Sequence, residues 1–221
     1  MNYDKIYYSI LSVYQECQVF SFPVDCFRLV KTYTNDCIPY SKLPSHKQKV
    51  CMTISTDAFL YQEIVYYNDK IRTNRQRFSL MHELGHVMLK HAEHPTETAE
   101  QEANAFASHI LAPRIAIHYA GCRNEADVAR IFHLTGEASR YAFDNYRRWH
   151  RYLTYYHMGE IDQALFKHFY SEEYGCFVWN RKICYSDEHL CINHSIDCSH
   201  CAEIHRTPAA FHTPSLDSAA H

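Results

Sequence analysis

Apolar residues recur with a helical period in the first part of the chain. Residues 3–17 carry apolar or aromatic side chains at positions 3, 6, 7, 10, 11 and 14, along one helical face. Pro23 and Asp25 are typical of a helix start and predict a second helix over about 23–33. We therefore expect the chain to begin with two helices.

The pattern changes between residues 37 and 67, where short runs predict strands. Residues 51–55 (CMTIS) alternate between apolar and polar side chains, and residues 63–67 (EIVYY) form a β-branched and aromatic run. The YNDK that overlaps and follows this run is typical of a turn. A small β-sheet is therefore expected after the N-terminal helices.

Helical patterns return in the remainder of the chain. A long helix is predicted over about 74–91, and residues 91–95 break it. The next helix is predicted to run to about residue 111, because Pro113 stops it. Residues 125–150 predict two short helices, and residues 159–170 predict one amphipathic helix.

Length and composition set the expected organisation. The chain has 221 residues, of which 47% are hydrophobic, so it can build one well-buried domain with a small appendage. We expect a compact α+β domain over residues 1–150, mostly helical with a small β-sheet. A helical and Cys/His-rich extension over 151–204 and a disordered tail over 205–221 are expected to follow.

Charge and hydropathy argue against two classes of protein. The formal net charge is −3, so direct nucleic-acid binding through a broad basic surface is not expected. No run of 18 apolar residues predicts a membrane span, and the N-terminus lacks the features of a signal peptide. We expect a cytoplasmic location, with the scattered cysteines reduced and mostly buried. These are Cys17, Cys26, Cys37, Cys51 and Cys122.

A five-residue motif in the long helix is the strongest chemical signal. His82-Glu83-Leu84-Gly85-His86 fits the pattern H-E-x-x-H. On a helix, residues i and i+4 share a face, so both imidazoles can reach one zinc ion. Glu83 lies beside that face, where its carboxylate can act as a general base without being a ligand. The same pattern also arises by chance in helices with solvated polar residues.

A catalytic zinc site needs a third protein ligand and an open position. If residues 91–95 reverse the chain, Glu100 returns level with His86, since each leg covers roughly 7–8 Å at 1.5 Å per residue. Asn104 follows one turn later on the same face and could orient a ligand. Glu97 and Glu102 are alternative ligands that are less well placed. In this interpretation His91 marks the turn rather than the site.

These motifs resemble those of the ImmA/IrrE family of zinc metallopeptidases. The resemblance rests on RQRFSLMHELGHVMLKH followed by ETAEQEANAFASHILAP, in which H-E-x-x-H precedes E-x-x-x-N. It is weaker in the flanking residues and covers about residues 20–135. By matching positions, the resemblance implies that His82, His86 and Glu100 bind Zn²⁺ and that Glu83 is the general base.

The resemblance also implies a fold, an activity and a partner. The fold would be a zincin-like α+β domain, and the activity would be hydrolysis of a peptide bond in a regulatory protein. Members of the family act on helix-turn-helix transcriptional repressors of mobile elements or stress responses, which would make such a repressor the substrate. The alternative is a non-catalytic metal-binding module that regulates by binding a repressor or DNA. The presence of Glu83 favours the enzyme.

Other signals leave alternatives open. His118, Tyr119 and Tyr141 are candidates for stabilising the oxyanion, and the sequence does not choose among them. Residues 128–151 have the rhythm of a helix-turn-helix motif with a basic end, although completing the core is the favoured interpretation. Residues 174–201 have ligand spacing that could hold a second, structural zinc. The residues concerned are Cys176, Cys184, Cys191, His194, Cys198 and Cys201.

Overall fold

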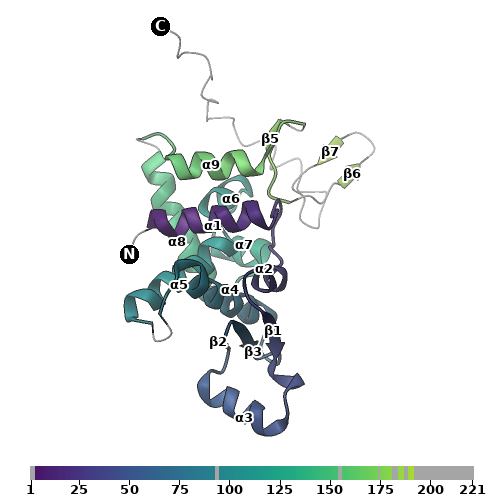
Figure 1. Cartoon of the computed structure of the whole chain (residues 1–221). Coiled ribbons are helices and arrows are strands. Elements are labelled where there is room, and N and C mark those ends of the chain that lie inside the picture. Colours follow the sequence, from purple (N-terminus) through teal and green to yellow (C-terminus); the bar gives the residue numbers. More distant parts are fainter. Residues whose placement is uncertain are drawn as a thin grey trace. The chain divides into compact units, whose positions relative to one another are not determined.

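The computed structural model describes residues 3–92, 95–153, 156–173 and 175–180, and the backbone of residues 184–186 and 189–191. The chain divides into two compact units, Met1–Arg181 and Lys182–His221. In the second unit, the antiparallel strands β6 (Cys184–Ser186) and β7 (His189–Cys191) are described. All other elements belong to the first unit (Figure 1).

The two N-terminal helices form where the sequence predicts them. Helix α1 (Tyr3–Glu16) buries the apolar stripe that carries its helical period, from Ile6 to Tyr14. Helix α2 (Cys26–Tyr33) begins after Asp25, whose carboxylate accepts a hydrogen bond from the backbone N–H of Arg28. This side-chain cap satisfies one of the unpaired donors at the helix start.

The sheet of the first unit has three strands in the order β1-β3-β2. Strand β1 (Asp36–Pro39) runs parallel to β3 (Ile64–Tyr67), and β2 (Ala58–Tyr61) runs antiparallel to it. Val65, at the centre of β3, is fully buried and lies opposite Leu60 of β2. Strand β2 therefore forms one edge of this sheet within the described residues.

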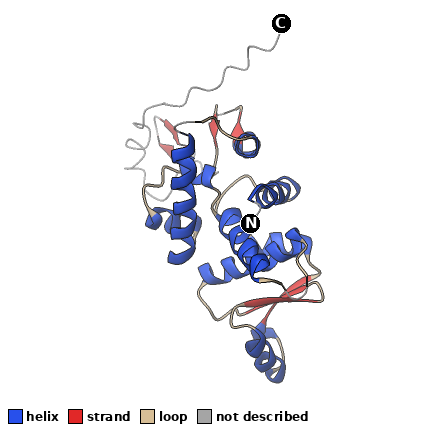
Figure 2. Ribbon diagram, turned by 90° about the vertical axis from the view of Figure 1, so that its left-hand side faces the viewer, coloured by secondary structure: helices blue, strands red, loops and turns tan. Residues whose placement is uncertain are grey.

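The strand predicted at residues 51–55 is wrong. Residues Ser45–Ile54 form helix α3, which follows a single 3-10 turn, η1 (Tyr40–Lys42). Helix α3 lies beyond the sheet, away from the other helices (Figures 1 and 2), and buries only Cys51. An alternation over five residues does not separate a strand from a helix that is exposed on nearly all sides.

Two long helices, α4 (Thr73–Leu89) and α5 (Glu97–Leu111), pack against each other at the centre of the unit. Gly85 lies at their contact, where an added Cβ would be 3.2 Å from Ala103 Cα and from Phe106. Thr96 caps α5 by accepting a hydrogen bond from the Ala99 N–H. The predicted pair of helices joined by a reversal is therefore present.

The remaining helices extend the first unit past residue 150, where we expected its boundary. Helices α6 (Arg114–Tyr119), α7 (Glu125–Phe132) and α8 (Gly136–Leu153) are followed by α9 (Glu160–Phe169) and the strand pair β4 (Tyr170–Ser171) and β5 (Cys176–Phe177). Asp162 of α9 is buried and accepts hydrogen bonds from Arg114 and from the Trp149 indole. These bonds join α9 to α6 and α8, so α9 is part of the same compact unit, which ends at Arg181.

The fold class is the expected one, α+β and mostly helical with a small mixed sheet. The five scattered cysteines are buried free thiols, as expected. No helix among the described residues is long and apolar enough to cross a membrane. The expected disordered tail, residues 205–221, lies outside the described residues.

Candidate metal centre

Helix α4 brings the two motif histidines together. His82 and His86 are four residues apart on one helical face, and their Nε2 atoms are 3.0 Å apart. Leu80, Met81 and Leu84 are fully buried, which fixes the rotation of α4 about its axis. The imidazoles keep limited exposure, with 18% of the His82 side chain and 11% of the His86 side chain accessible.

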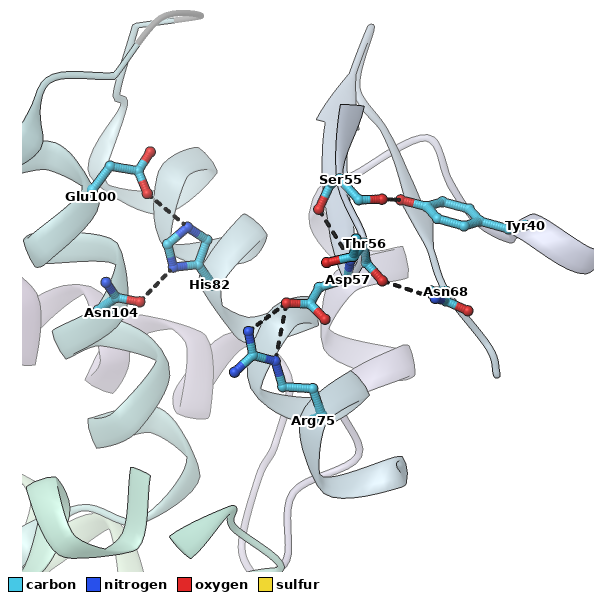
Figure 3. Close-up of polar contacts among 9 residues, drawn as sticks. All are labelled: Tyr40, Ser55, Thr56, Asp57, Asn68, Arg75, His82, Glu100 and Asn104. Atoms are coloured by element: carbon cyan, nitrogen blue, oxygen red, sulfur yellow. Dashed lines mark hydrogen bonds and ion pairs between the residues drawn. The ribbon is translucent and has the colours of Figure 1, made fainter. Parts of the chain in front are cut away.

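Glu100 completes the cluster from the first turns of α5. Its Oε2 is 3.2 Å from His82 Nε2, and its Oε1 is 3.5 Å from His86 Nε2. Figure 3 shows the Glu100 carboxylate and the Asn104 side chain on either side of the His82 ring. The Glu100 side chain is 44% exposed, so the cluster opens to solvent on this side. This placement agrees with the residue count along the two predicted helices, which favoured Glu100 over Glu97 and Glu102.

The three residues place donor atoms close enough together to share one metal ion. Ligand atoms about 2.0–2.1 Å from a tetrahedral ion lie about 3.3 Å from one another. The two Nε2 atoms are 3.0 Å apart, His82 Nε2 is 3.2 Å from Glu100 Oε2, and His86 Nε2 is 3.5 Å from Glu100 Oε1. Two imidazoles and one carboxylate are also a donor set that zinc accepts in catalytic sites. The residues therefore fit a metal ion, and their role as ligands stays a prediction.

Asn104 determines which nitrogen of His82 faces the cluster. The Nδ1 of His82 is 3.0 Å from Asn104 Oδ1, an acceptor, so Nδ1 carries the proton and donates a hydrogen bond to this oxygen. The lone pair on Nε2 then points toward the Glu100 carboxylate, which is also an acceptor. Two acceptors in contact repel each other unless a cation lies between them. The expected role of Asn104 in orienting a ligand is consistent with this contact.

Burial keeps both cluster histidines neutral. Desolvation lowers the pKa of His82, although the nearby Glu100 carboxylate opposes the shift. Desolvation is the main cause that lowers the pKa of His86 to about 4, and a positive charge on His82 or His91 would lower it further. A neutral imidazole is the form that binds a metal ion, so the environment favours binding at neutral pH.

Glu83 lies between the cluster and strand β2. Burial raises the pKa of Glu83 to about 8, while the backbone N–H of Leu60 opposes the shift and the Glu100 carboxylate adds to it. Arg75 of α4 pairs with Asp57, directly before β2, and so ties the strand to the helix that carries Glu83 (Figure 3). Helix α4 and strand β2 therefore both help to hold the Glu83 carboxylate beside the cluster.

The two alternative ligands have different surroundings. Glu97 is exposed in the first turn of α5, where a carboxylate favours the helix start. Glu102 faces away from the donor atoms and lies 3.4 Å from the Nε2 of His91. His91 itself contacts His86, with 3.0 Å between their Nδ1 atoms. The sequence places His91 in the turn after α4, and its contact with His86 follows only from the structure.

The candidate oxyanion residues lie in aromatic clusters. Tyr141 contacts His109, which is nine residues, or about 14 Å, along α5 from Glu100. His118 and Tyr119 pack against each other, and His118 also contacts Trp149 of α8. We therefore include none of the three in the proposed site.

Helices α7 and α8, the pair with the helix-turn-helix rhythm, contribute to the hydrophobic core. Val128 and Phe132 of α7 are fully buried, and Ala142 and Trp149 of α8 are buried as well. The core therefore accounts for the apolar pattern of residues 128–151.

The predicted second zinc site falls largely outside the described residues. Cys176 is a half-buried free thiol in β5. Cys184 and Cys191 pair across strands β6 and β7, but only their backbone is described. His194, Cys198 and Cys201 lie outside the described residues, so this site stays a prediction.

Comparison with known proteins adds an independent observation. Residues 44–143 match the family model of the IrrE N-terminal-like domain of peptidases. The match covers α3 to the first part of α8 and includes all three cluster residues and Glu83. No curated protein matches the chain. The match supports an ImmA/IrrE-family peptidase domain over residues 44–143 of the chain.

Proposed function

We propose that this protein is a zinc-dependent endopeptidase that cleaves a regulatory protein. The observation that carries the proposal is the convergence of His82 Nε2, His86 Nε2 and a Glu100 oxygen beside the carboxylate of Glu83. The peptidase family of residues 44–143 supports the same reaction class. The proposed substrate is a helix-turn-helix repressor of a mobile element or a stress response.

The chain's own residues suit hydrolysis of an amide. When bound, zinc acts as a Lewis acid that polarises a carbonyl and makes water a stronger acid. Glu83 would accept the proton of the attacking water and then donate it to the leaving amine. Its pKa of about 8 in the absence of a cation would fall when a cation binds nearby, which makes the carboxylate available as a base.

The edge of the sheet suggests how a substrate would lie. Strand β2 forms one edge of the sheet within the described residues, and the backbone N–H of Leu60 is next to Glu83. An extended peptide can add to a sheet edge through main-chain hydrogen bonds. We therefore propose that the scissile segment is extended, as in a linker of the substrate rather than in one of its helices.

The proposed compartment is the cytoplasm. The buried cysteines Cys17, Cys26, Cys37, Cys51 and Cys122 are free thiols. Unpaired thiols suit a reducing compartment, which is also where a transcriptional repressor acts.

Co-expression with the helix-turn-helix protein encoded nearest its gene tests the proposal, under conditions that induce the element or the stress response. We expect the wild type to cleave the repressor and Glu83→Gln to leave it intact, because the amide cannot accept a proton. Cleavage by both proteins would contradict the role of Glu83. An intact repressor that co-purifies with both would instead support the non-catalytic regulatory module.

A further inference from the structure

His91 lies against one of the cluster histidines and is itself paired on its far side. Its Nδ1 is 3.0 Å from His86 Nδ1, and its Nε2 is 3.4 Å from Glu102 Oε2. The side chains are largely shielded, with 8% of His91 and 17% of Glu102 exposed. Neither residue has a ligand atom in the metal cluster.

The end of helix α4 places His91 in this position. Lys90 has left-handed backbone angles, φ 58° and ψ 48°, directly after the last helical residue. The N–H of Lys90 then donates to the Val87 carbonyl, and the N–H of His91 donates to the His86 carbonyl. This pair of bonds is a Schellman motif, which folds the chain back over the last turn of the helix. The His91 ring therefore returns to the His86 ring, five residues earlier.

The chemistry of the three side chains fixes the direction of their hydrogen bonds. A carboxylate oxygen accepts, so the Nε2 of His91 carries the hydrogen that faces Glu102 Oε2. In the neutral imidazole, the Nδ1 of His91 is then an acceptor and accepts a hydrogen bond from the Nδ1–H of His86. The Nε2 of His86 is left with its lone pair, and this is the atom that faces His82 and Glu100.

We propose that His91 and Glu102 are positioning residues that hold His86 in the tautomer and ring orientation required for metal binding. The proposal rests on the metal site of the proposed function. Asn104 makes the equivalent contact to His82. Each proposed ligand, His82 and His86, would then donate a hydrogen bond from Nδ1 to its own acceptor. Such partners of ligand histidines typically change metal affinity by about 10–100-fold.

Two substitutions of His91 separate hydrogen bonding from packing. His91→Asn places an amide oxygen near the present position of Nδ1 and keeps an acceptor for His86. His91→Leu fills similar space and offers no acceptor. If His91 only packs, the apolar leucine should preserve the site at least as well as asparagine does.

The experiment is zinc binding by the full-length protein, measured by competition with a fluorescent chelator, with thermal unfolding of each metal-free variant as a check on folding. We expect about 10–100-fold weaker binding for His91→Leu, and binding by His91→Asn within about threefold of wild type. Glu102→Leu should lie between them, because it leaves the His91 tautomer unfixed.

Two results would overturn the positioning role while leaving the metal site intact. One is wild-type affinity in His91→Leu, and the other is an equal loss in the leucine and asparagine variants. Failure of the wild-type protein to bind zinc would instead overturn the proposed metal site, and the role of His91 with it.

Discussion

The two ends of helix α5 place imidazole rings in opposite environments. At its N-terminal end, Glu100, Glu102 and Asn104 contact the ring nitrogens of three histidines. At its C-terminal end, His109 is fully buried against Tyr7, with ring centroids 4.9 Å apart. Neither ring nitrogen of His109 has a hydrogen-bond partner among the described residues.

The difference shows why partners identify a site better than burial does. Burial lowers the pKa of His86 to about 4 and that of His109 to about 3, so the two shifts are alike. Of these two histidines, only His86 has a polar side chain at each ring nitrogen, with His91 at Nδ1 and the Glu100 carboxylate at Nε2. The contrast supports the proposed metal site beside the N-terminal end of α5 and a packing role for His109 at its C-terminal end.

The largest expected effect is loss of the metal when a ligand is removed. Residues that only contact a ligand typically change metal affinity by about 10–100-fold. Glu100→Ala and His82→Ala each remove a proposed ligand and should therefore lower zinc affinity by more than about 100-fold. Metal analysis after dialysis against a weak chelator would measure this. The matched control is His109→Ala, another helical histidine of α4–α5, which should keep its zinc if it folds. A zinc-replete Glu100→Ala protein would overturn the ligand assignment.

A smaller loss is expected from Asn104. Asn104→Leu removes the acceptor for His82 Nδ1 and should weaken zinc binding by about tenfold, the lower end of the range, since water can replace an exposed oxygen. Asn104→Asp keeps an acceptor and should bind zinc more tightly than the leucine variant. The reverse order would show that His82 is not oriented by this contact.

Gly85 tests whether the close contact of α4 and α5 supports the site. Its added Cβ would lie 3.2 Å from the Ala103 Cα of α5. Overpacking against backbone costs about 1–3 kcal/mol, more than the about 1 kcal/mol that alanine gains over glycine in a helix, so Gly85→Ala should lower the free energy of unfolding by about 1 kcal/mol and also weaken zinc binding. The control is Gly136→Ala, where an added Cβ meets nothing within 4 Å. Chemical denaturation compares the two. Equal stability in both variants would contradict the proposed contact.

The smallest effect is a gain at the other end of α5. His109→Phe removes two unpaired polar atoms and should raise the free energy of unfolding by about 1 kcal/mol at pH 7. The unfolded chain binds a proton at His109 below about pH 6.5, whereas the folded protein resists protonation down to about pH 3. Wild-type stability is therefore lost as the pH falls through this window, and the advantage of His109→Phe should grow. A constant difference between pH 7 and 4 would contradict this account.

Elements with a long apolar period could be predicted from the sequence, whereas helix α3, which buries only Cys51, could not. Helices α1, α4 and α5 follow from their periodic stripes, and the i, i+4 spacing with a turn brings His82, His86 and Glu100 together. Helix α3 was mistaken for a strand because its five-residue alternation lacks a buried face to define a period.

The residues that contact the proposed ligands were harder to predict. His91 lies outside the helical face of His86 and returns only because Lys90 adopts a left-handed conformation, for which glycine is the usual signal. Glu102 was set aside because it faces away from Glu100, yet that is the side on which His91 lies. The compact unit extends past the expected boundary at residue 150 because Asp162 of α9 binds Arg114 of α6 and Trp149 of α8. These contacts join separate helices, so no local sequence pattern predicts them.

The most direct test is a crystal structure of the full-length protein grown with zinc, with anomalous diffraction recorded on both sides of the zinc absorption edge. We predict an anomalous peak about 2.0–2.2 Å from the Nε2 atoms of His82 and His86 and from a carboxylate oxygen of Glu100. Glu83 should lie beside the ion without binding it. Zinc bound elsewhere, with these three side chains uncoordinated, would contradict the account.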